Sequence, residues 1–337
     1  MAASIADVAR LANVSISTVS RVLNRRELVN EKTRERVESA IRELDYQPNA
    51  FARGLMLRKS EMVGLVLPDL HGEFYSEIIR GANLKARELG YNLVVTSTQD
   101  DADCRIMLNN MQQRTLLDGV AVMVSEVTDI LQEVLAGFRL PFVLLDADIR
   151  GMPHDCVDID QQHGVEALMK HVLQTQGMKR VIFVGGPETN VDTIARHEAY
   201  SQALARAATP AAASDVHFLD YEYETAFEFA KTHMRNWAGP KTCVFAANDE
   251  MAAGIVAAAR DCDIDVPTQL AVVGFDDTRI ARMTRPPLTT VRAPMTQMGE
   301  MAIELLCKRL ADPKCPSMHV SLQPELVIRE SCGESVS

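Results

Sequence analysis

The sequence predicts an α/β protein in which a small N-terminal all-α head precedes a larger body built on parallel sheets. Apolar residues recur at helical spacing through residues 4–44, whereas strand-like and helix-like stretches alternate from residue 61 onward. The charge is divided in the same way. Residues 1–60 hold 11 basic and 7 acidic residues, a balance of +4; the whole chain holds 35 and 46, so the remainder carries −15. This division predicts a head that faces nucleic acid and an acidic body.

The first predicted element is a short helix within residues 4–13, "SIADVARLAN". Ser4 is a suitable N-cap, because its hydroxyl can accept a hydrogen bond from the first turn. One apolar face is formed by Ile5, Val8, Ala9 and Ala12. Asn13 follows at the point where the chain must turn, and asparagine tolerates the left-handed backbone that a tight turn needs.

A second helix is predicted after this turn, in "VSISTVSRVLN" at residues 14–24. Ser15 caps it, and Val19, Val22 and Leu23 face inward. The residues left facing outward are Ile16, Ser17, Thr18, Ser20 and Arg21. A third helix follows in residues 30–44, so the pattern predicts a helix-turn-helix unit whose second helix enters the major groove. Short hydroxyl side chains allow close approach to base edges, and an arginine pairs with guanine or phosphate. The alternative is a small helical bundle with a polar face.

The body alternates strand-like runs such as "MVGLVLP", "PFVLLD", "TCVFAAN" and "LAVVGF" with helical stretches, in a pattern that occurs twice. Ligands of parallel α/β sheets bind at the carboxyl ends of the strands. The polar residues that directly follow predicted strands are Asp69, Ser125, Asp146, Asn248, Asp249, Asp276 and Asp277. We expect Asp249 and Asp277 to cap helices and Asn248 and Asp276 to contact a ligand, although capping is the alternative for these two as well.

Enzyme classes are not indicated by the sequence. The paired glycines of "VGGPETN" lack dinucleotide-loop spacing, and the chain contains neither a phosphate-loop motif nor G-x-S-x-G. The seven cysteines are dispersed and contain no C-x-x-C pair, so free thiols are expected. No residues stand at a recognisable zinc spacing. We therefore predict no catalytic residues, no metal site and no cofactor. Because no signal peptide is recognisable, the predicted location is the cytoplasm.

At several motifs the chain resembles the LacI/GalR family of transcriptional regulators. These are "IADVARLANVSISTVSRVLN", "VNEKTRERVESAIRELDYQPNAFARGL", "VGLVLPDLHGEFYSEIIRGA", "VFAANDEMAAGIVAAARD", "VPTQLAVVGFDDTRIARMTRPPLTTVRAPM" and "ELVIRES", which stand in family order along nearly the whole chain. The resemblance implies a regulator, acting as a repressor, whose body is a periplasmic-binding-protein-like sensor. Its partners would be a pseudo-palindromic DNA operator, a second copy of the chain and a small effector.

From this resemblance we expect four parts. These are a head at residues 1–47, a hinge helix or linker at 48–60, an effector-binding and dimerisation body at 61–330, and a tail at 331–337. The resemblance implies that the hinge becomes helical on the operator. So short a segment with Gly54 inside it is a poor isolated helix, which agrees with this expectation. Leu55 matches the family's leucine wedge in the minor groove. The full set of expected DNA contacts is Ser4, Ser15, Ile16, Ser17, Thr18, Ser20, Arg21, Asn24, Asn49, Ala52 and Leu55.

The resemblance also implies that the body has two lobes that close around the effector. The expected first lobe comprises residues 61–160 and 293–318, and the second comprises residues 161–290 and 319–330. With the strand-end residues included, the expected effector contacts are Asp69, Phe74, Ser125, Asp146, Asp160, Arg196, Tyr221, Asn248 and Asp276. Core packing is the alternative for Phe74 and Tyr221.

Carboxylates, amides and an aromatic face suit a sugar, although a nucleoside would also stack. The resemblance leaves induction and corepression both open. Two other functions explain less of the sequence than a regulator does. A solute-binding protein does not explain the helix-turn-helix head, and a nucleotide-dependent enzyme lacks its phosphate loop.

Overall fold

The computed structural model describes residues 3–24, 26–46, 60–98, 101–114, 117–149, 151–207 and 215–333. It divides into a head unit, Met1–Glu61, and a body unit, Met62–Ser337, which are described separately. Most of the expected hinge, with Asn49, Ala52 and Leu55, lies outside the described residues, as does the end of the expected tail. Within the described part of the chain, no helix is both long enough and apolar enough to cross a membrane.

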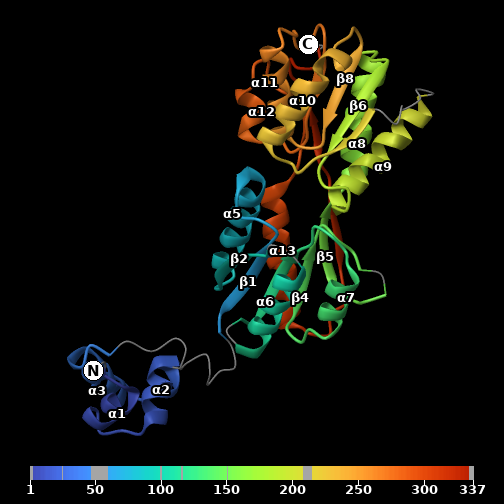
Figure 1. The fold of residues 1–337 in the computed structure, drawn as a ribbon. Helices are drawn as coiled ribbons and strands as arrows, with labels where there is room; N and C mark the ends of the chain where they lie inside the picture. The colour runs from blue at the N-terminus through green and yellow to red at the C-terminus, as the bar shows by residue number, and fades with distance from the viewer. Residues whose placement is uncertain are drawn as a thin grey trace. The chain divides into compact units, whose positions relative to one another are not determined.

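The head consists of helices α1 (Ile5–Leu11), α2 (Ile16–Asn24) and α3 (Glu31–Glu43), with a short 3₁₀ turn, η1 (Arg26–Leu28), before α3 (Figure 1). The helices share one small core, whose buried residues are Val8, Ala9, Ala12, Val19, Val22, Val37 and Ala40. Asn13 has a φ of 51°, so the predicted left-handed turn between the first two helices is confirmed. Small alanines on α1 allow the other helices to pack closely against it.

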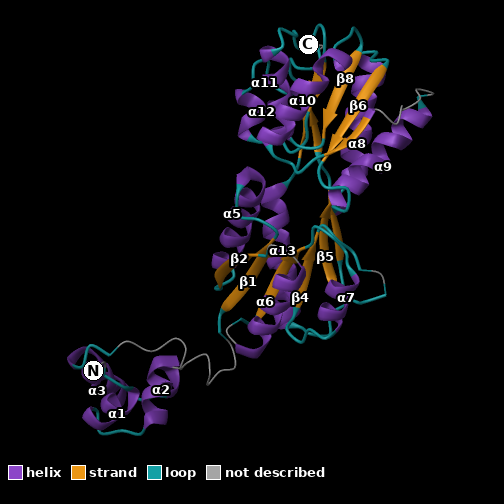
Figure 2. Ribbon diagram, in the orientation of Figure 1, coloured by secondary structure: helices purple, strands orange, loops and turns teal. Residues whose placement is uncertain are grey.

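The first lobe of the body contains a six-stranded sheet in which every neighbouring pair is parallel. Its strand order is β11 (His319–Leu322), β5 (Asp155–Ile159), β4 (Phe142–Leu145), β3 (Gly119–Met123), β1 (Met62–Leu67) and β2 (Asn92–Ser97). Helices α5 (Gly72–Glu88) and α13 (Met295–Ala311) pack together and against the sheet. Helices α6 (Asp101–Arg114) and α7 (Asp129–Ala136) contribute to a separate core that includes Val66, Val122 and Leu144. Figure 2 shows this helix–sheet–helix layering.

Two glycines allow α5 and α13 to cross closely. A Cβ placed on Gly81 would lie 1.9 Å from the carbonyl oxygen of Thr296, and one on Gly299 would lie 2.1 Å from that of Ile78. Both distances are far below van der Waals contact. The two backbones therefore approach each other at a separation that only glycine permits.

The second lobe contains a four-stranded parallel sheet, again with helices on both faces. Its order is β7 (Val216–Phe218), β6 (Arg180–Gly185), β8 (Thr242–Ala246) and β9 (Ala271–Val273). Helix α10 (Tyr223–Trp237) packs on α11 (Asp249–Asp261), which also contacts the short α12 (Arg279–Met283). Helix α8 (Gln161–Lys170), which continues into a π-helical turn η2 (His171–Thr175), packs on α9 (Val191–Arg206). The predicted α/β body with parallel sheets is confirmed.

The chain passes between the lobes after β5, after β10 (Thr290–Arg292) and after β11. The antiparallel pair of β10 and β12 (Glu325–Val327) lies at these crossings. The expected boundary at residue 318 is wrong for β11, because residues 319–322 pair with β5 of the first sheet. The next strand, β12, pairs with β10 at the crossings. The misassigned strand has four residues and lies at the sheet edge, and only Leu322 of them is buried, so its hydrophobic pattern carries little information.

Three hydrogen bonds join the lobes across the opening between them. The backbone N–H of Val191 donates to the carbonyl of Ser125 at 2.9 Å. The N–H of Arg279 donates to the Glu73 carboxylate at 2.7 Å, and the Thr189 hydroxyl donates to Glu126. The two lobes are therefore in direct contact in this structure.

Candidate nucleic-acid interface and effector pocket

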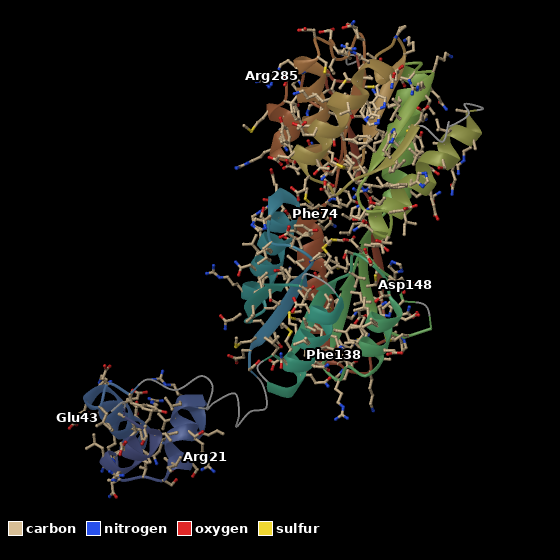
Figure 3. All side chains as sticks on the ribbon, in the orientation of Figure 1. Arg21, Glu43, Phe74, Phe138, Asp148 and Arg285 are labelled. Atoms are coloured by element: carbon tan, nitrogen blue, oxygen red, sulfur yellow. The ribbon has the colours of Figure 1, made fainter. Side chains whose placement is uncertain are left out.

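The outer face of α2 presents the side chains expected to contact DNA. Ile16 is 48% exposed, Ser17 and Arg21 are also exposed, and Thr18 and Ser20 are half-buried. Figure 3 labels Arg21 on this helix. Asn24 is the last residue of α2, and its side chain lies outside the description. Because Val19 and Val22 anchor the opposite face in the core, the exposed face has a fixed orientation within the head.

Ser4 and Ser15 hold helix ends. The Ser4 hydroxyl accepts from the Asp7 N–H, and the Ser4 backbone N–H donates to the Asp7 carboxylate at 3.0 Å, which completes a capping box. The Ser4 hydroxyl also donates to this carboxylate at 2.6 Å. The Ser15 hydroxyl accepts from the Thr18 N–H at 3.1 Å and also contacts the Ser17 and Thr18 hydroxyls at 2.8 Å. This hydroxyl cluster fixes the first turn of α2.

Arg36 of α3 braces the turn between the first two helices. Its guanidinium donates to the carbonyl of Ala12 at 2.5 and 3.2 Å and to that of Asn13 at 2.9 Å. These carbonyls lie at the end of α1, where backbone acceptors have no partner within the helix. No sequence pattern assigned Arg36 to this turn.

A cavity of about 110 Å³ lies between the lobes of the body. Its lining includes seven of the nine expected effector contacts. These are Phe74, Ser125, Asp146, Arg196, Tyr221, Asn248 and Asp276. The other lining residues are Pro68, Tyr75, Met123, Val124, Asn190, Val191 and Asp192. Figure 3 shows Phe74 at the end of α5 that faces the second lobe.

Carboxylates dominate the polar lining. Both oxygens of Asp146 are buried and accept no hydrogen bond, and the same holds for Oδ1 of Asp276, which is 6% exposed. Asp146 has a φ of 62°, because the chain turns sharply after β4. Burial raises the pKa of Asp146 well above its usual value, and the neighbouring carboxylate of Asp192 raises it further. Burial likewise raises the pKa values of Asp192 and Asp276.

Arg196 is the one cationic side chain in this lining. It projects from α9, is 3% exposed, and its Nη2 lies 3.7 Å from Asp192 and 3.9 Å from Asp276. Its Nε donates to Gln161 at 2.9 Å and its Nη1 to the carbonyl of Ala247 at 2.5 Å. Burial alone would lower the pKa of Arg196, but the Asp192 and Asp276 carboxylates raise it above its ordinary value. The guanidinium is therefore a fixed positive charge.

Tyr221 and Asn248 combine structural and lining roles. Tyr221 has a φ of 73°, and its ring lies so close to Gly186 that a Cβ there would be 2.2 Å from it. Its hydroxyl bonds to Thr193 at 2.7 Å and to Asn190 at 3.0 Å. Asn248 caps α11 by accepting from the Met251 N–H, and its amide donates to the carbonyl of Tyr221 at 2.9 Å. Asn248 therefore caps α11 and lines the pocket at the same time.

Asp69 and Asp160 do not line the pocket, contrary to expectation. Asp69 accepts hydrogen bonds from the N–H groups of Leu70 and His71 and from the His71 ring, so it shapes the loop before α5. Asp160 caps α8 through the N–H of His163 and accepts from Gln323 at 3.0 Å. Both positions follow strands, but their side chains satisfy local backbone donors.

Asp249 and Asp277 are structural residues, but the prediction that they cap helices is wrong, because Asn248 is the N-cap of α11 and Thr278 is the N-cap of α12. Asp249 starts α11, is buried, and accepts from Thr278 and from the Thr290 hydroxyl. Asp277 is buried and pairs with Arg292 at 2.8 Å and with Arg329. Both tie the strand ends of the second lobe together beneath the pocket residues.

Asp192 was missed by the sequence analysis. It stands in the first turn of α9, where an acidic residue is common because it interacts favourably with the helix dipole, so the residue type alone does not indicate a pocket residue. The spacing from Arg196 does indicate one. Asp192 and Arg196 are four residues apart, which places them on the same helix face, and that face is the pocket wall.

Known proteins share both parts of this arrangement. Residues 4–49 match the family model for bacterial regulatory proteins of the lacI family, and residues 171–332 match the model for a periplasmic binding protein-like domain. Catabolite control protein A of Priestia megaterium is 33% identical over 333 residues, which cover 98% of this chain and 99% of that protein. The ribose operon repressor of Escherichia coli strain K12 is 32% identical over 332 residues, with the same coverage. The structure of a complex of transcriptional regulator CelR with cellobiose is similar at a TM-score of 0.73 and 28% identity, covering 98% of this chain and 99% of that one.

Proposed function

Because the chain belongs to the lacI family of bacterial regulatory proteins, we propose that it is a sequence-specific DNA-binding repressor controlled by a small effector. The effector, a sugar, binds in the pocket between the lobes. The observation that carries this proposal is one chain containing both a helix-turn-helix head and a pocket lined by unpartnered buried carboxylates. Neither feature alone indicates a regulator whose DNA binding is controlled by an effector. Their combination in one chain does, because it links a DNA-binding element to a ligand-binding one.

The domain organisation that we propose has a DNA-binding head at 1–47, a connector at 48–60 and an effector-binding body at 61–330, followed by a tail at 331–337. Within the body, we place β11 in the first lobe and β12 in the crossing region, which is supported by the pairing of β11 with β5 and of β12 with β10. The effector changes the relation between the lobes and so alters the ability of the connector to order on DNA. By linkage, DNA must then change the affinity for the effector by the same factor.

The operator is read by the exposed face of α2. Ile16 and Ser17 lie at its start, where a recognition helix meets base edges, and Arg21 lies one turn further along. A single head of this size makes few contacts, so two copies acting on a pseudo-palindrome give a large gain in effective concentration. We propose that the homodimer contacts lie around Tyr75–Leu89 and on helices of the second lobe. Leu84 of α5 is 50% exposed, and Leu89, the C-cap of α5, is 40% exposed.

A sugar effector is supported by the chemistry of the pocket. Free carboxylate oxygens accept hydrogen bonds from hydroxyl groups, and Phe74, Tyr75 and Tyr221 offer aromatic surface for the C–H face of a sugar ring. The similar CelR structure is a complex with cellobiose, and one relative is named as a ribose operon repressor. We further propose that the protein is not an enzyme and acts in the cytoplasm, where an operator is accessible.

The test of DNA recognition is a randomised-site selection followed by gel shift at two or more salt concentrations. Arg21→Ala is expected to weaken binding to the selected site by roughly 10- to 100-fold, the value of one good base or phosphate contact. Arg42→Ala is the matched control, since Arg42 is an exposed arginine on α3 of the same head. Equal losses for both variants would show that general charge, rather than the face of α2, determines binding.

A further inference from the structure

We propose that the edge of the first-lobe sheet carries a transition-metal site, suited best to Zn²⁺ and formed by Cys156, Asp158 and His319. The observation that carries this inference is the meeting of a thiol, a carboxylate and an imidazole, whose ligand atoms all lie within 4.8 Å of one another. None of the three residues lines the pocket between the lobes. The inference is therefore independent of the proposed effector site.

Two neighbouring strands bring the three side chains together. Cys156 and Asp158 are two residues apart on β5, so their side chains point to the same face of the sheet. Strand β11 lies parallel beside β5, with His319 in register with Cys156 (Figure 1). Paired residues of neighbouring strands share a face, and His319 therefore joins the other two. The sequence prediction of no metal site rested on ligand spacing along the chain, which cannot detect ligands 161 positions apart.

The donor atoms suit zinc or a similar transition metal. Zn²⁺ binds thiolate, imidazole and carboxylate groups, often with three protein ligands and one water molecule. A thiolate disfavours Mg²⁺ and Ca²⁺, which prefer oxygen ligands. Zinc bonds of roughly 2.0–2.3 Å place ligand atoms about 3.5 Å apart, so these three atoms need to approach one another by about 1.3 Å at most.

The three side chains extend from the sheet interior to the solvent. Cys156 is buried, and its thiol donates to the carbonyl of Ala147 at 3.1 Å. Asp158 has one buried oxygen without a hydrogen-bond partner, and its other oxygen bonds to Nε2 of His319. The His319 side chain is 48% exposed, so an ion can enter from the sheet edge. Metal binding would replace the Asp158–His319 hydrogen bond and release the thiol proton to solvent.

The electrostatic surroundings of the site favour a cation. Burial raises the pKa of the Cys156 thiol, and the carboxylates of Asp158 and Asp148 raise it further. Negative groups that disfavour a bare thiolate also attract a divalent cation. A bound zinc ion reverses the effect on the thiol, because a coordinating thiol is deprotonated.

A metal at this position would fasten the sheet edge beside the lobe crossings. Strand β11 is an edge strand whose one neighbour in the sheet is β5, and the chain crosses between the lobes after both strands. Asp160 and Gln323, which directly follow the two strands, are joined by a hydrogen bond at 3.0 Å. The metal adds a second link near the start of the same strand pair. Because the ion binds the folded state, it should stabilise the body.

The experiment measures metal binding to the full chain after a chelator has removed metal under reducing conditions. Co²⁺ serves as the spectroscopic probe, because a cobalt–thiolate bond gives a charge-transfer band and tetrahedral cobalt gives intense d–d bands. We expect one Co²⁺ per chain, with both signatures, and its displacement by Zn²⁺. The Zn²⁺ affinity is then measured by competition with a chromophoric chelator.

Substitutions of similar size test each ligand. His319→Gln, Asp158→Asn and Cys156→Ser should each weaken Zn²⁺ binding at least about 100-fold, because even groups that only orient metal ligands contribute roughly 10- to 100-fold. Cys156→Ser should also remove the cobalt–thiolate band. Cys315→Ser is the matched control, since Cys315 is a half-buried thiol in the loop before β11 and lies outside the cluster.

Thermal unfolding gives a second measurement. One equivalent of Zn²⁺ should raise the unfolding temperature of the wild type and of Cys315→Ser, but not that of His319→Gln. If Cys156→Ser does not fold, the exposed His319 side chain makes His319→Gln the deciding variant.

The proposal is overturned if His319→Gln binds Zn²⁺ as tightly as the wild type, or if the cobalt complex lacks the thiolate band. It is also overturned if Cys315→Ser weakens binding as much as the ligand substitutions do, because scattered thiols would then be holding the ion. Specific operator binding in the gel shift is measured without added metal, so failure of this proposal is distinguishable from failure of the proposed function.

Discussion

Replacement of Arg196 by alanine tests how the pocket is held together. In the wild-type protein the Arg196 guanidinium lies 3.7 Å from Asp192 and 3.9 Å from Asp276, and all three side chains are largely removed from water. Arg196→Ala leaves the carboxylates without their cation and the Ala247 carbonyl without its donor. We therefore expect loss of effector binding together with a large loss of stability.

The magnitude follows from the contacts that are broken. Removal of one partner from a buried ion pair typically costs about 3–5 kcal/mol, because the remaining charge has no compensation. A domain is typically stable by about 5–15 kcal/mol, so the variant would lose a substantial part of the total. Asp192→Asn removes one of the uncompensated charges. In that background Arg196→Ala should cost about 1–2 kcal/mol less than it does alone.

The assay is urea unfolding followed by tryptophan fluorescence. Trp237 is the sole tryptophan of the chain, is 2% exposed and ends α10 of the second lobe, the lobe that contains Arg196. The two single variants and the double variant complete a thermodynamic cycle. A loss below 1 kcal/mol for Arg196→Ala, or an identical loss in both backgrounds, would refute the ion-pair reasoning.

Two further predictions concern the framework of the body. Gly299→Ala places a Cβ 2.1 Å from the carbonyl oxygen of Ile78 and should cost at least about 1–3 kcal/mol in thermal unfolding; Gly137→Ala, whose nearest contact would be 3.7 Å, is the control and should cost little. Burial raises the pKa of Asp249 to about 7 from an ordinary value of 3.8. Its proton is held more tightly in the folded state, so this contribution to stability is complete below about pH 4 and is lost as the pH rises to 7. Asp249→Asn should remove roughly 4 kcal/mol of that pH dependence, measured as the difference between the two unfolding profiles; parallel profiles would contradict this assignment.

The head was predictable because its signals are local. Asn13 marks the turn by its tolerance of positive φ, Ser4 caps α1, and apolar spacing identifies the buried faces. Arg36 could not be assigned to the turn that it braces, because that contact joins residues more than twenty positions apart. Hydrophobic periodicity places a side chain on a face but does not identify its partner.

The pocket was predictable only in part, for a related reason. Strand ends converge at one edge of a sheet, so Asp146, Asn248 and Asp276 were found from position alone. The same rule selected Asp69, which turns back to accept from N–H groups in its own loop. Asp160, expected from its place near the crossing, instead caps α8. The choice between a ligand and a nearby backbone donor depends on side-chain direction, which the order of residues does not specify.

The hydrogen bonds that join the lobes at Ser125, Glu73 and Glu126 have a kinetic consequence. A molecule held behind them leaves only when these bonds open together, so its residence time depends on the frequency of that opening as well as on its own contacts. Weakening one of these hydrogen bonds should shorten the residence time of a bound molecule. The ligand concentration needed for half-occupancy should change much less.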